Sequence, residues 1–396
     1  MSIVKVSDNI YSVGVMNPAL RVFDIVMKSP FGTSYNSYLI TGTKNVLVET
    51  VHSDFFDEYI YNVGSLIDIA NIDYIVMNHT ELDHSGSLAK LLEMNPNLIV
   101  ICTAVAQKYL RSILNRDFKC IPVKNGDSLD IGNCKLNFIV APLLHWPDSM
   151  MTYVENDNVL FSCDFLGCHF CEPSGTDESI HYKNEYLNQF KYYFNGIFSP
   201  FKPYVLAGIE RIKDLAISAI CPSHGPIINT EINERINDYI SFCNTPEKSK
   251  KSVAIIYASA YKCTQLLAQA AFNSIKEKTD FNPILIDIVS TDFTKTVENV
   301  NRCDALIVGS CTINRDAPKI IWDVLSSIDV INIKGKPAGA FGSYGWSGEA
   351  VSLIKDRLCG IKYNFIRDGF KVNFMPTDED LNNMKSYALE IVSNVK

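Results

Sequence analysis

The run His79-Thr80-Glu81-Leu82-Asp83-His84, which follows the apolar segment 72–77, constrains the fold more than any other part of the chain. Four of its six residues are potential metal ligands. In an extended segment His79, Glu81 and Asp83 would project to one side, and residues 85–90 resemble the start of a helix. A strand that leads through a loop into a helix places a site at the carboxyl end of the strand.

The mixture of side chains indicates which metal this run would hold. Two imidazoles with two carboxylates make a harder ligand set than an all-histidine or cysteine-rich one, and such a set favours iron or manganese over zinc. Three further candidates, His145, Asp164 and His224, each follow a β-like apolar run and lie beside Gly, Pro or Ser. A lone histidine after a strand is more often a core or surface residue, but four of the seven histidines fit one pattern. We therefore predict metal binding.

The order and spacing of these residues resembles the metallo-β-lactamase superfamily, whose motif is H-x-H-x-D-H followed by H, D and H. Glu81 stands where the second histidine is usual, and this departure is typical of the flavodiiron proteins, which carry a diiron centre in place of two zinc ions. The resemblance implies that two non-haem irons share seven catalytic ligands. One iron would be held by His79, Glu81, His145 and Asp164, and the other by Asp83, His84, Asp164 and His224, with Asp164 bridging.

Composition limits the other classes of function. A length of 396 residues allows two or three domains. The net charge of −8 argues against nucleic-acid binding. We see no signal peptide and no apolar run of transmembrane length. The twelve cysteines are scattered, as in a protein with reduced thiols. We therefore expect a cytoplasmic protein that binds neither nucleic acid nor membrane.

The chain reads as two domains. Residues 1–247 alternate strand-like segments (10–15, 34–40 and 46–49) with helical ones (54–67, 104–114 and 185–198), and two antiparallel sheets with outer helices would fit the αββα sandwich of the resembled superfamily. Residues 244–251 are polar, basic and contain proline, so we predict a linker there. In residues 252–396, apolar strands (252–257, 283–288, 305–309 and 337–341) alternate with helical patterns that end at 380–392. This alternation predicts a doubly wound parallel sheet, as in flavodoxins.

Loops of the second domain fall where a parallel sheet places a ligand. The loop 259–264 offers hydroxyls and amides at a predicted helix start, which suits a phosphate. The chain has neither G-x-G-x-x-G nor G-x-x-x-x-G-K-[ST], so a mononucleotide remains. Ser259, Tyr261 and Thr264 match the flavodoxin pattern S/T-x-Y/T-G-N/S-T, whereas Lys262 and Cys263 depart from it. Alone, this loop fits a phosphate site and an ordinary turn equally well.

Two further loops favour FMN over an ordinary glycine-rich turn. Residues 309–314 resemble the flavodoxin G-S-P-T loop with Cys311 for proline, and residues 341–350 resemble the isoalloxazine-contacting signature of flavodiiron proteins. The FMN contacts implied by these resemblances are Ser259, Ala260, Tyr261, Lys262, Cys263, Thr264, Cys311, Thr312, Ile313, Asn314, Ser343, Tyr344, Gly345 and Trp346.

The resemblance covers both domains and implies reduction of O2 to water or of NO to N2O. No rubredoxin-like C-x-x-C pair follows in the chain, so we expect an external electron donor, a rubredoxin-like or flavin-reductase-like protein. The family is a head-to-tail homodimer, and a dimer of dimers is also compatible. Two rival functions are a dizinc hydrolase, which Glu81 disfavours, and a pure electron carrier, which the complete ligand set disfavours.

Three weaker candidates lie close to the predicted ligands in sequence. Cys168 and Cys171 form a C-x-x-C that is a redox dithiol or half of a zinc site in other proteins. No second pair and no thioredoxin-like context surrounds them, which disfavours both roles. His169 and Tyr193 are candidates for lining the metal pocket, and for Tyr193 a plain core position fits equally well.

Overall fold

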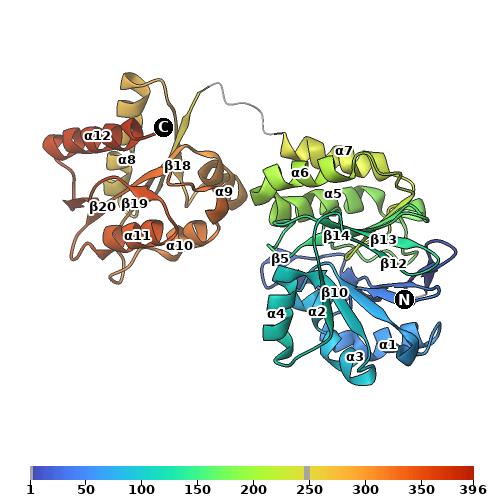
Figure 1. Ribbon diagram of the computed structural model, residues 1–396. Helices are drawn as coiled ribbons and strands as arrows, with labels where there is room; N and C mark the ends of the chain where they lie inside the picture. The colour runs from blue at the N-terminus through green and yellow to red at the C-terminus, as the bar shows by residue number, and fades with distance from the viewer. Residues whose placement is uncertain (1–2, 245–249) are drawn as a thin grey trace. The chain divides into compact units, whose positions relative to one another are not determined.

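The computed structural model describes residues 3–244 and 250–396. The chain divides into two compact units, residues 1–245 and 246–396 (Figure 1). Most of the predicted linker, residues 245–249 of 244–251, lies outside the described residues. Among the described helices, none combines the length and the apolarity that a bilayer crossing would require.

The first unit is a sandwich of two sheets. The seven-stranded sheet contains, in spatial order, β1 (Val4–Lys5), β2 (Ile10–Ser12), β7 (Tyr38–Ile40), β8 (Val46–Val48), β9 (Tyr74–Met77), β10 (Ile99–Thr103) and β11 (Cys120–Val123). The five-stranded sheet contains β12 (Ser128–Asp130), β13 (Lys135–Val140), β14 (Met150–Val154), β15 (Val159–Cys163) and β16 (Ala219–Pro222). Two small ribbons pair β3 (Val15–Asn17) with β6 (Thr33–Tyr35) and β4 (Val22–Phe23) with β5 (Met27–Lys28).

Helices cover the outer faces of this sandwich (Figure 1). They are α1 (Phe56–Gly64), α3 (Leu88–Met94), α4 (Ala104–Leu114), α5 (Lys183–Tyr193), α6 (Lys202–Ile212) and α7 (Ile232–Cys243), while the short helix α2 (Leu82–Ser85) follows β9 at the strand ends. One apolar cluster joins inward side chains of both sheets, such as Val48 and Val76 from the first and Phe138 and Phe161 from the second. The predicted αββα fold is confirmed.

The expectation of two antiparallel sheets is wrong, because both sheets are mixed. Strands β8, β9, β10 and β11 pair in parallel, and so do β15 and β16. Helices α1, α3 and α4 lie in the connections between the first four of these strands. A helical crossover returns the chain in the same direction, so each strand pairs in parallel with the one before it.

The second unit is a doubly wound sheet, as predicted. Its order is β18 (Asn282–Asp287), β17 (Ser252–Ala258), β19 (Ala305–Ser310), β20 (Pro337–Tyr344) and β21 (Asn364–Phe365), and β22 (Phe370–Asn373) also pairs with β20. All these pairs are parallel. The helices are α8 (Cys263–Lys278), α9 (Phe293–Arg302), α10 (Lys319–Ser326), α11 (Glu349–Gly360) and α12 (Asp378–Ser393).

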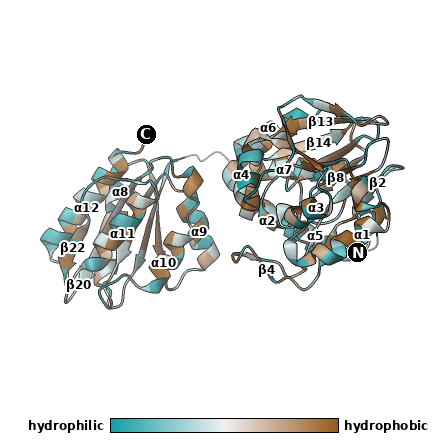
Figure 2. Ribbon diagram, turned by 60° about the horizontal axis from the view of Figure 1, so that its bottom comes forward, coloured by the Kyte–Doolittle hydropathy of each residue, from teal (hydrophilic) through white to brown (hydrophobic). Residues whose placement is uncertain are grey.

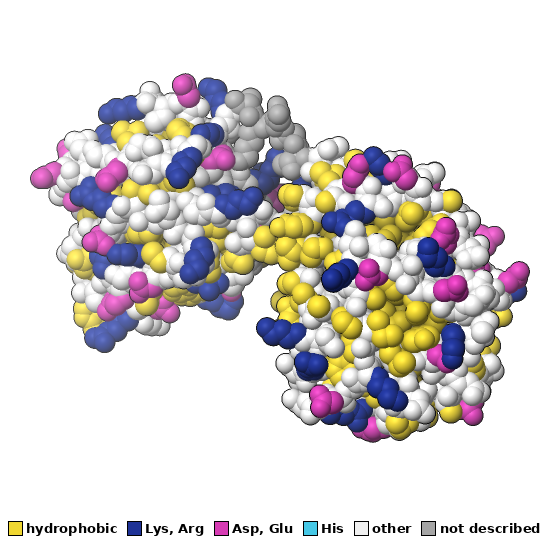
Figure 3. All heavy atoms as spheres, viewed as in Figure 1, with side chains coloured by type: hydrophobic (Ala, Val, Ile, Leu, Met, Phe, Trp, Pro, Cys, Tyr) yellow, Lys and Arg dark blue, Asp and Glu magenta, His cyan; other side chains and the backbone are white. Residues whose placement is uncertain are grey.

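Hydropathy explains the layers of this unit. All seven residues of β17 are buried, because helices cover both faces of a parallel sheet. Apolar and polar residues alternate along the helices in Figure 2, as expected of helices with one face on a sheet. Separate apolar clusters lie on the two faces of the sheet. On the face drawn in Figure 3, acidic and basic side chains are mixed on each unit.

Candidate functional site

The first unit brings all seven predicted metal ligands together at the carboxyl ends of its central strands. His79 follows β9, and Glu81 precedes the short helix α2, which contains Asp83 and His84. Asp164 follows β15 directly. His145 and His224 lie in the loops before β14 and after β16. The prediction that the run is extended as far as Asp83 is wrong, because α2 starts at Leu82. Asp83 therefore faces a different group of ligands from His79 and Glu81.

Three of the side chains form a first cluster, His79, Glu81 and His145. Glu81 Oε2 lies 3.3 Å from His79 Nε2 and 3.4 Å from His145 Nε2. Asp164 Oδ2 lies 3.7 Å and 3.5 Å from the same two nitrogens. Burial disfavours the charged form of the Glu81 carboxylate, but the rings of His145 and His79 hold the pKa of Glu81 below its ordinary value.

The second cluster contains Asp83, His84 and His224. His224 Nε2 lies 3.0 Å from Asp83 Oδ2, and His84 Nε2 lies 3.4 Å from Asp83 Oδ1. Asp164 Oδ1 lies 3.2 Å from His84 Nε2 and 3.4 Å from His224 Nε2. The two oxygens of Asp164 therefore face different clusters, which is the geometry of a bridging carboxylate.

These distances fit two metal ions. Ligand atoms about 2.1 Å from an ion and at right angles to each other lie about 3 Å apart. Both carboxylate oxygens of Asp83 and Nε2 of His84 are buried without a hydrogen-bond partner among the described residues. Buried polar atoms rarely remain unpaired, and an ion between these atoms would satisfy them. Mixed imidazole and carboxylate donors suit iron.

Outer hydrogen bonds orient the ligand rings. His79 Nδ1 lies 3.3 Å from both carboxylate oxygens of Asp148, to which the Thr80 hydroxyl donates at 2.8 Å. His224 Nδ1 lies 2.7 Å from the backbone oxygen of Ser34. Each contact leaves Nε2 of the ring free to face the centre. Burial acts against the charge of His79, but Asp148 and Glu81 raise its pKa to about 10. In the loaded protein an ion would take the place of that proton.

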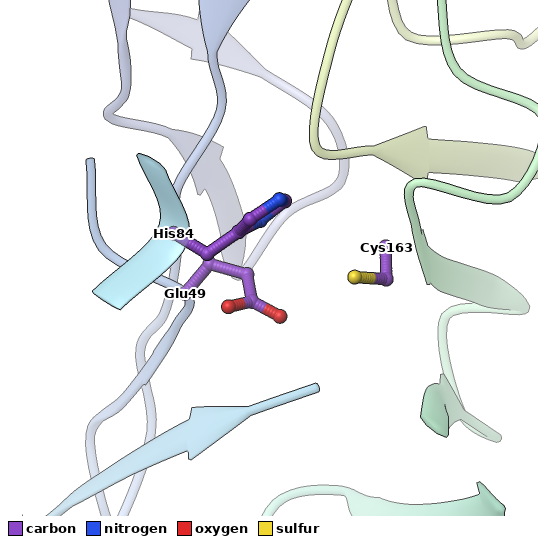
Figure 4. Close-up of side chains that lie close together, drawn as sticks. All are labelled: Glu49, His84 and Cys163. Atoms are coloured by element: carbon purple, nitrogen blue, oxygen red, sulfur yellow. The ribbon is translucent and has the colours of Figure 1, made fainter. Parts of the chain in front are cut away.

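Glu49 is a buried carboxylate behind the second cluster that no sequence pattern singled out. It lies 1% exposed just after β8 with a positive φ of 60°, and burial raises its pKa to about 8. Its Oε1 accepts from the backbone N–H of Asn78 at 2.8 Å. This hydrogen bond ties the end of β8 to the end of β9. Glu49, His84 and Cys163 lie together in Figure 4, with ligand-type atoms within 4.8 Å of one another.

Of the weaker candidates, Tyr193 and His169 lie beside the predicted ligands, whereas Cys168 and Cys171 belong to no ligand cluster among the described residues. Tyr193, on α5, is 1% exposed and its hydroxyl donates to Asp164 Oδ1 at 3.3 Å. The ring of His169 lies 4.9 Å from that of His224, between ring centroids. Cys168 is buried and Cys171 half-buried as free thiols, and neither belongs to a ligand cluster found among the described residues.

In the second unit, the predicted FMN loops follow β17, β19 and β20 and so lie at one edge of the sheet. Tyr261 and Trp346 are 87% and 88% exposed beside them. Lys262 precedes α8 with a φ of 67° and does not cap that helix, but the Ser259 hydroxyl accepts from the backbone N–H of Gln265 in the first turn at 3.3 Å. Backbone amides and hydroxyls at a helix start suit a phosphate, so the residues present fit a mononucleotide.

Two further predicted FMN contacts, besides Ser259, use their hydroxyl groups within the unit. Ser343 Oγ donates to the backbone oxygen of Phe374 at 2.6 Å, and Thr264 Oγ1 accepts from the Ser343 amide at 3.4 Å. Ser343 and Tyr344 belong to β20, which continues three residues beyond the predicted end at 341. Cys263, the first residue of α8, is partly exposed. The other predicted contacts lie at least partly exposed in the loops: Ser259, Ala260, Cys311, Thr312, Ile313, Asn314 and Gly345.

Comparison with known proteins identifies relatives over the whole chain. The family model described as ODP family beta lactamase matches residues 33–225. The flavo-diiron protein FprA2 of Clostridium acetobutylicum is 46% identical, with 100% of both chains covered. The type A flavoprotein fprA of Rhodobacter capsulatus is 32% identical, with 99% of this chain and 91% of that one covered. The structure of rubredoxin oxygen:oxidoreductase from Desulfovibrio gigas superposes with a TM-score of 0.72 at 28% identity, covering 100% and 98% of the two chains.

Proposed function

Because this chain belongs to the flavodiiron proteins, we propose that it reduces O2 to water, NO to N2O, or both, with FMN and a diiron centre as cofactors. The observation that carries this function is the placement of Asp164 between two ligand clusters, with one carboxylate oxygen toward each. O2 is the preferred substrate in this proposal, because a structural relative is named an oxygen:oxidoreductase.

The seven side chains would hold the two irons as the geometry suggests. His79, Glu81 and His145 would bind one ion, Asp83, His84 and His224 the other, and Asp164 both. When bound, the iron pair supplies electrons two at a time to a diatomic molecule, and the flavin replaces them. The protein contributes ligand rings that are held in place by buried hydrogen bonds.

Access to the centre is on the side of the first cluster. The side chains of His145 and Glu81 are 18% and 19% exposed, whereas those of His79, His84, Asp164 and His224 are at most 2% exposed. Trp146 packs 5.0 Å from His79, and Phe198 packs 6.2 Å from His145, between ring centroids. These rings limit the entry of water while leaving His145 and Glu81 open to a small diatomic molecule.

FMN would bind the second unit with its phosphate at the start of α8. Lys262 would add a positive charge there, and its left-handed backbone takes the conformation that glycine adopts at this position of flavodoxin loops. Tyr261 and Trp346 offer exposed ring faces for the isoalloxazine.

The proposed catalytic unit is a head-to-tail homodimer that receives electrons from a separate protein. The tip of the β4–β5 hairpin exposes Ile25 and Val26 at 94% and 74%, and the neighbouring Phe23 packs on His169 with centroids 4.0 Å apart. Exposed Tyr261 and Trp346 flank the flavin loops. Apolar surfaces of this kind favour burial against a partner, and a second copy would bring its flavin loops to this hairpin.

The proposed location is the cytoplasm, since all twelve cysteines are free thiols.

Metal analysis and gas consumption test the function together. Protein from iron-replete cells should contain about two irons and one FMN per chain, and after reduction it should consume O2 or NO. Asp164→Asn should lose iron and turnover but keep a reducible flavin, because a neutral amide bridges two cations poorly. Stoichiometric zinc with hydrolase activity, or full activity in Asp164→Asn, would contradict the proposal.

A further inference from the structure

Two free cysteines of the first unit, neither of them a proposed metal ligand, lie in contact on the seven-stranded sheet. The sulfur atoms of Cys102 and Cys120 are 3.6 Å apart, although the two residues are 18 positions apart in the chain. Strands β10 and β11 pair in parallel with Cys102 opposite Pro122. Cys120 stands two residues before Pro122, so both cysteines point to the same face of the sheet.

The two thiols differ in their access to solvent. Cys102 is fully buried in the apolar cluster that also contains Ala106 and Leu110 of α4. Cys120 packs against the same cluster but is only half-buried. It is the first residue of β11, the last strand of the sheet. A small oxidant that arrives from solvent therefore meets Cys120 before Cys102.

Cys120 is also the thiol that ionises more easily. Its hydrogen bond with Cys102 and the positive charge of Arg111 on α4 hold the pKa of Cys120 below its ordinary value. The same hydrogen bond and burial raise the pKa of Cys102. The thiolate is the nucleophile in thiol oxidation, and an accessible cysteine of low pKa beside a second thiol is the arrangement of redox-sensitive pairs.

The alternative of a zinc site does not fit this pair. Structural zinc takes four ligands, mostly Cys and His. Neither Cys102 nor Cys120 belongs to a ligand cluster found among the described residues. The pair therefore lacks the further ligands that zinc needs, and chemistry between the two sulfur atoms remains.

We propose that Cys120 and Cys102 form a peroxide-reactive dithiol, in which hydrogen peroxide oxidises Cys120 and Cys102 then closes a disulfide with it. The Cys120 thiolate attacks one peroxide oxygen, the O–O bond breaks, and Cys120 becomes a sulfenic acid. The other oxygen leaves as hydroxide and takes up the proton that the thiol lost. Next the Cys102 sulfur attacks the Cys120 sulfur, the S–O bond breaks, and the departing hydroxide takes the Cys102 proton.

The balance of this reaction is complete with peroxide as the oxidant. The two sulfur atoms together lose two electrons, the two thiols lose two hydrogens, and one peroxide becomes two waters. The chemistry uses neither the iron nor the FMN of the proposed function. In a reducing compartment the disulfide is transient, because cellular thiols reduce it again.

The sheet allows the sulfur atoms to approach. A disulfide requires them to close from 3.6 Å to about 2.0 Å. Cys120 begins a strand at the edge of the sheet, so the start of β11 can shift toward Cys102 while the inner strands keep their pairing.

Peptide mapping detects the disulfide directly. The full-length protein with oxidised iron and FMN is treated with a small excess of hydrogen peroxide, quenched with catalase, alkylated under denaturing conditions, and cleaved after Lys and Arg. Cleavage puts Cys102 in the peptide 91–108 and Cys120 in the peptide 120–124, so only a disulfide joins them. We expect peroxide to produce the joined peptide and dithiothreitol to reverse it, while the intact chain loses and regains two hydrogens.

Matched variants identify the attacking thiol. Cys102→Ser should stop at the sulfenic acid on Cys120, which dimedone traps. Cys120→Ser should give neither the joined peptide nor a dimedone adduct at this site, because the remaining thiol is buried and of raised pKa. Cys359→Ser removes an exposed cysteine and should leave the joined peptide unchanged. Iron and FMN content show that each variant is folded.

Absence of the joined peptide from the peroxide-treated unmodified protein would overturn the proposal and leave an ordinary hydrogen-bonded pair of thiols. A loss of two hydrogens without the joined peptide would also overturn it, since the reactive pair would then lie elsewhere. Equal dimedone labelling at this site in Cys102→Ser and Cys120→Ser would contradict the assignment of Cys120 as the attacking thiol.

Discussion

Asp148 fixes the orientation of His79 from outside the ligand set. Its carboxylate is fully buried, 3.3 Å from His79 Nδ1, and accepts from Thr80. Asp148→Asn should weaken iron binding about 10- to 100-fold, because the amide holds the ring and its tautomer less well. Titration of the iron-free protein with ferrous ion under anaerobic conditions measures this loss.

A suitable control for this variant is Asp117→Asn, which changes an exposed aspartate of the same unit. It should leave iron affinity unchanged. Equal affinities in the Asp148→Asn and unmodified proteins would show that His79 needs no carboxylate partner.

Glu81 is the residue that separates this centre from a dizinc one. It contributes a carboxylate oxygen within 3.4 Å of both histidines of the first cluster. Glu81→His should shift the metal preference toward zinc, since a third imidazole softens that cluster. Expression with equal iron and zinc, followed by metal analysis, gives the ratio, and an unchanged iron excess would count against this reading of the ligand set.

Single residues were predictable from sequence where a motif places them and not where a distant contact defines them. The seven proposed ligands stand in one recognisable order, and the structure brings them together. The roles of Asp148 and Glu49 arise from partners 69 and 29 residues away. Local periodicity contains no information about such pairs.

At the scale of elements, the start of helix α8 combines a strained residue with a charge. Lys262 holds a left-handed conformation that a glycine adopts without cost. Lys262→Gly should therefore stabilise the second unit by up to about 1 kcal/mol yet weaken FMN binding, more so at low salt. Lys262→Ala lacks both the charge and the backbone freedom of glycine, so it should weaken FMN binding without stabilising the second unit. Thermal unfolding with and without FMN distinguishes the two variants.

Element positions followed from local pattern, whereas strand direction did not. Residues 104–114 were predicted as a helix and form α4 with the same bounds. The antiparallel sheets expected in the first unit are mixed, because pairing direction depends on the crossover helices and not on the strands' own residues. The run 79–84 contains a short helix for a related reason, since tertiary packing overrides the local tendency to extend.

At the scale of the molecule, the second unit should be an independent flavoprotein. Its sheet, its helices and both of its apolar clusters lie within residues 250–396. A fragment starting at Lys250 should fold cooperatively, turn yellow with FMN, and release FMN on denaturation. A folded fragment that ignores added FMN would contradict the assignment of the flavin loops.

The dimer proposal predicts that two variants, each inactive alone, regain turnover when their chains form a mixed dimer. Asp164→Ala removes the residue placed between the two proposed iron sites. Ala260→Glu puts a carboxylate where the FMN phosphate would bind, and the two negative charges repel each other. Each homodimer should be inactive. Random mixing should restore about a quarter of normal turnover, because half of the dimers are mixed and each has one of two iron–flavin pairs intact. In the mixed dimer, the only iron–flavin pair that survives the two substitutions is shared between the chains. Verified heterodimers without turnover would therefore place electron transfer within one chain.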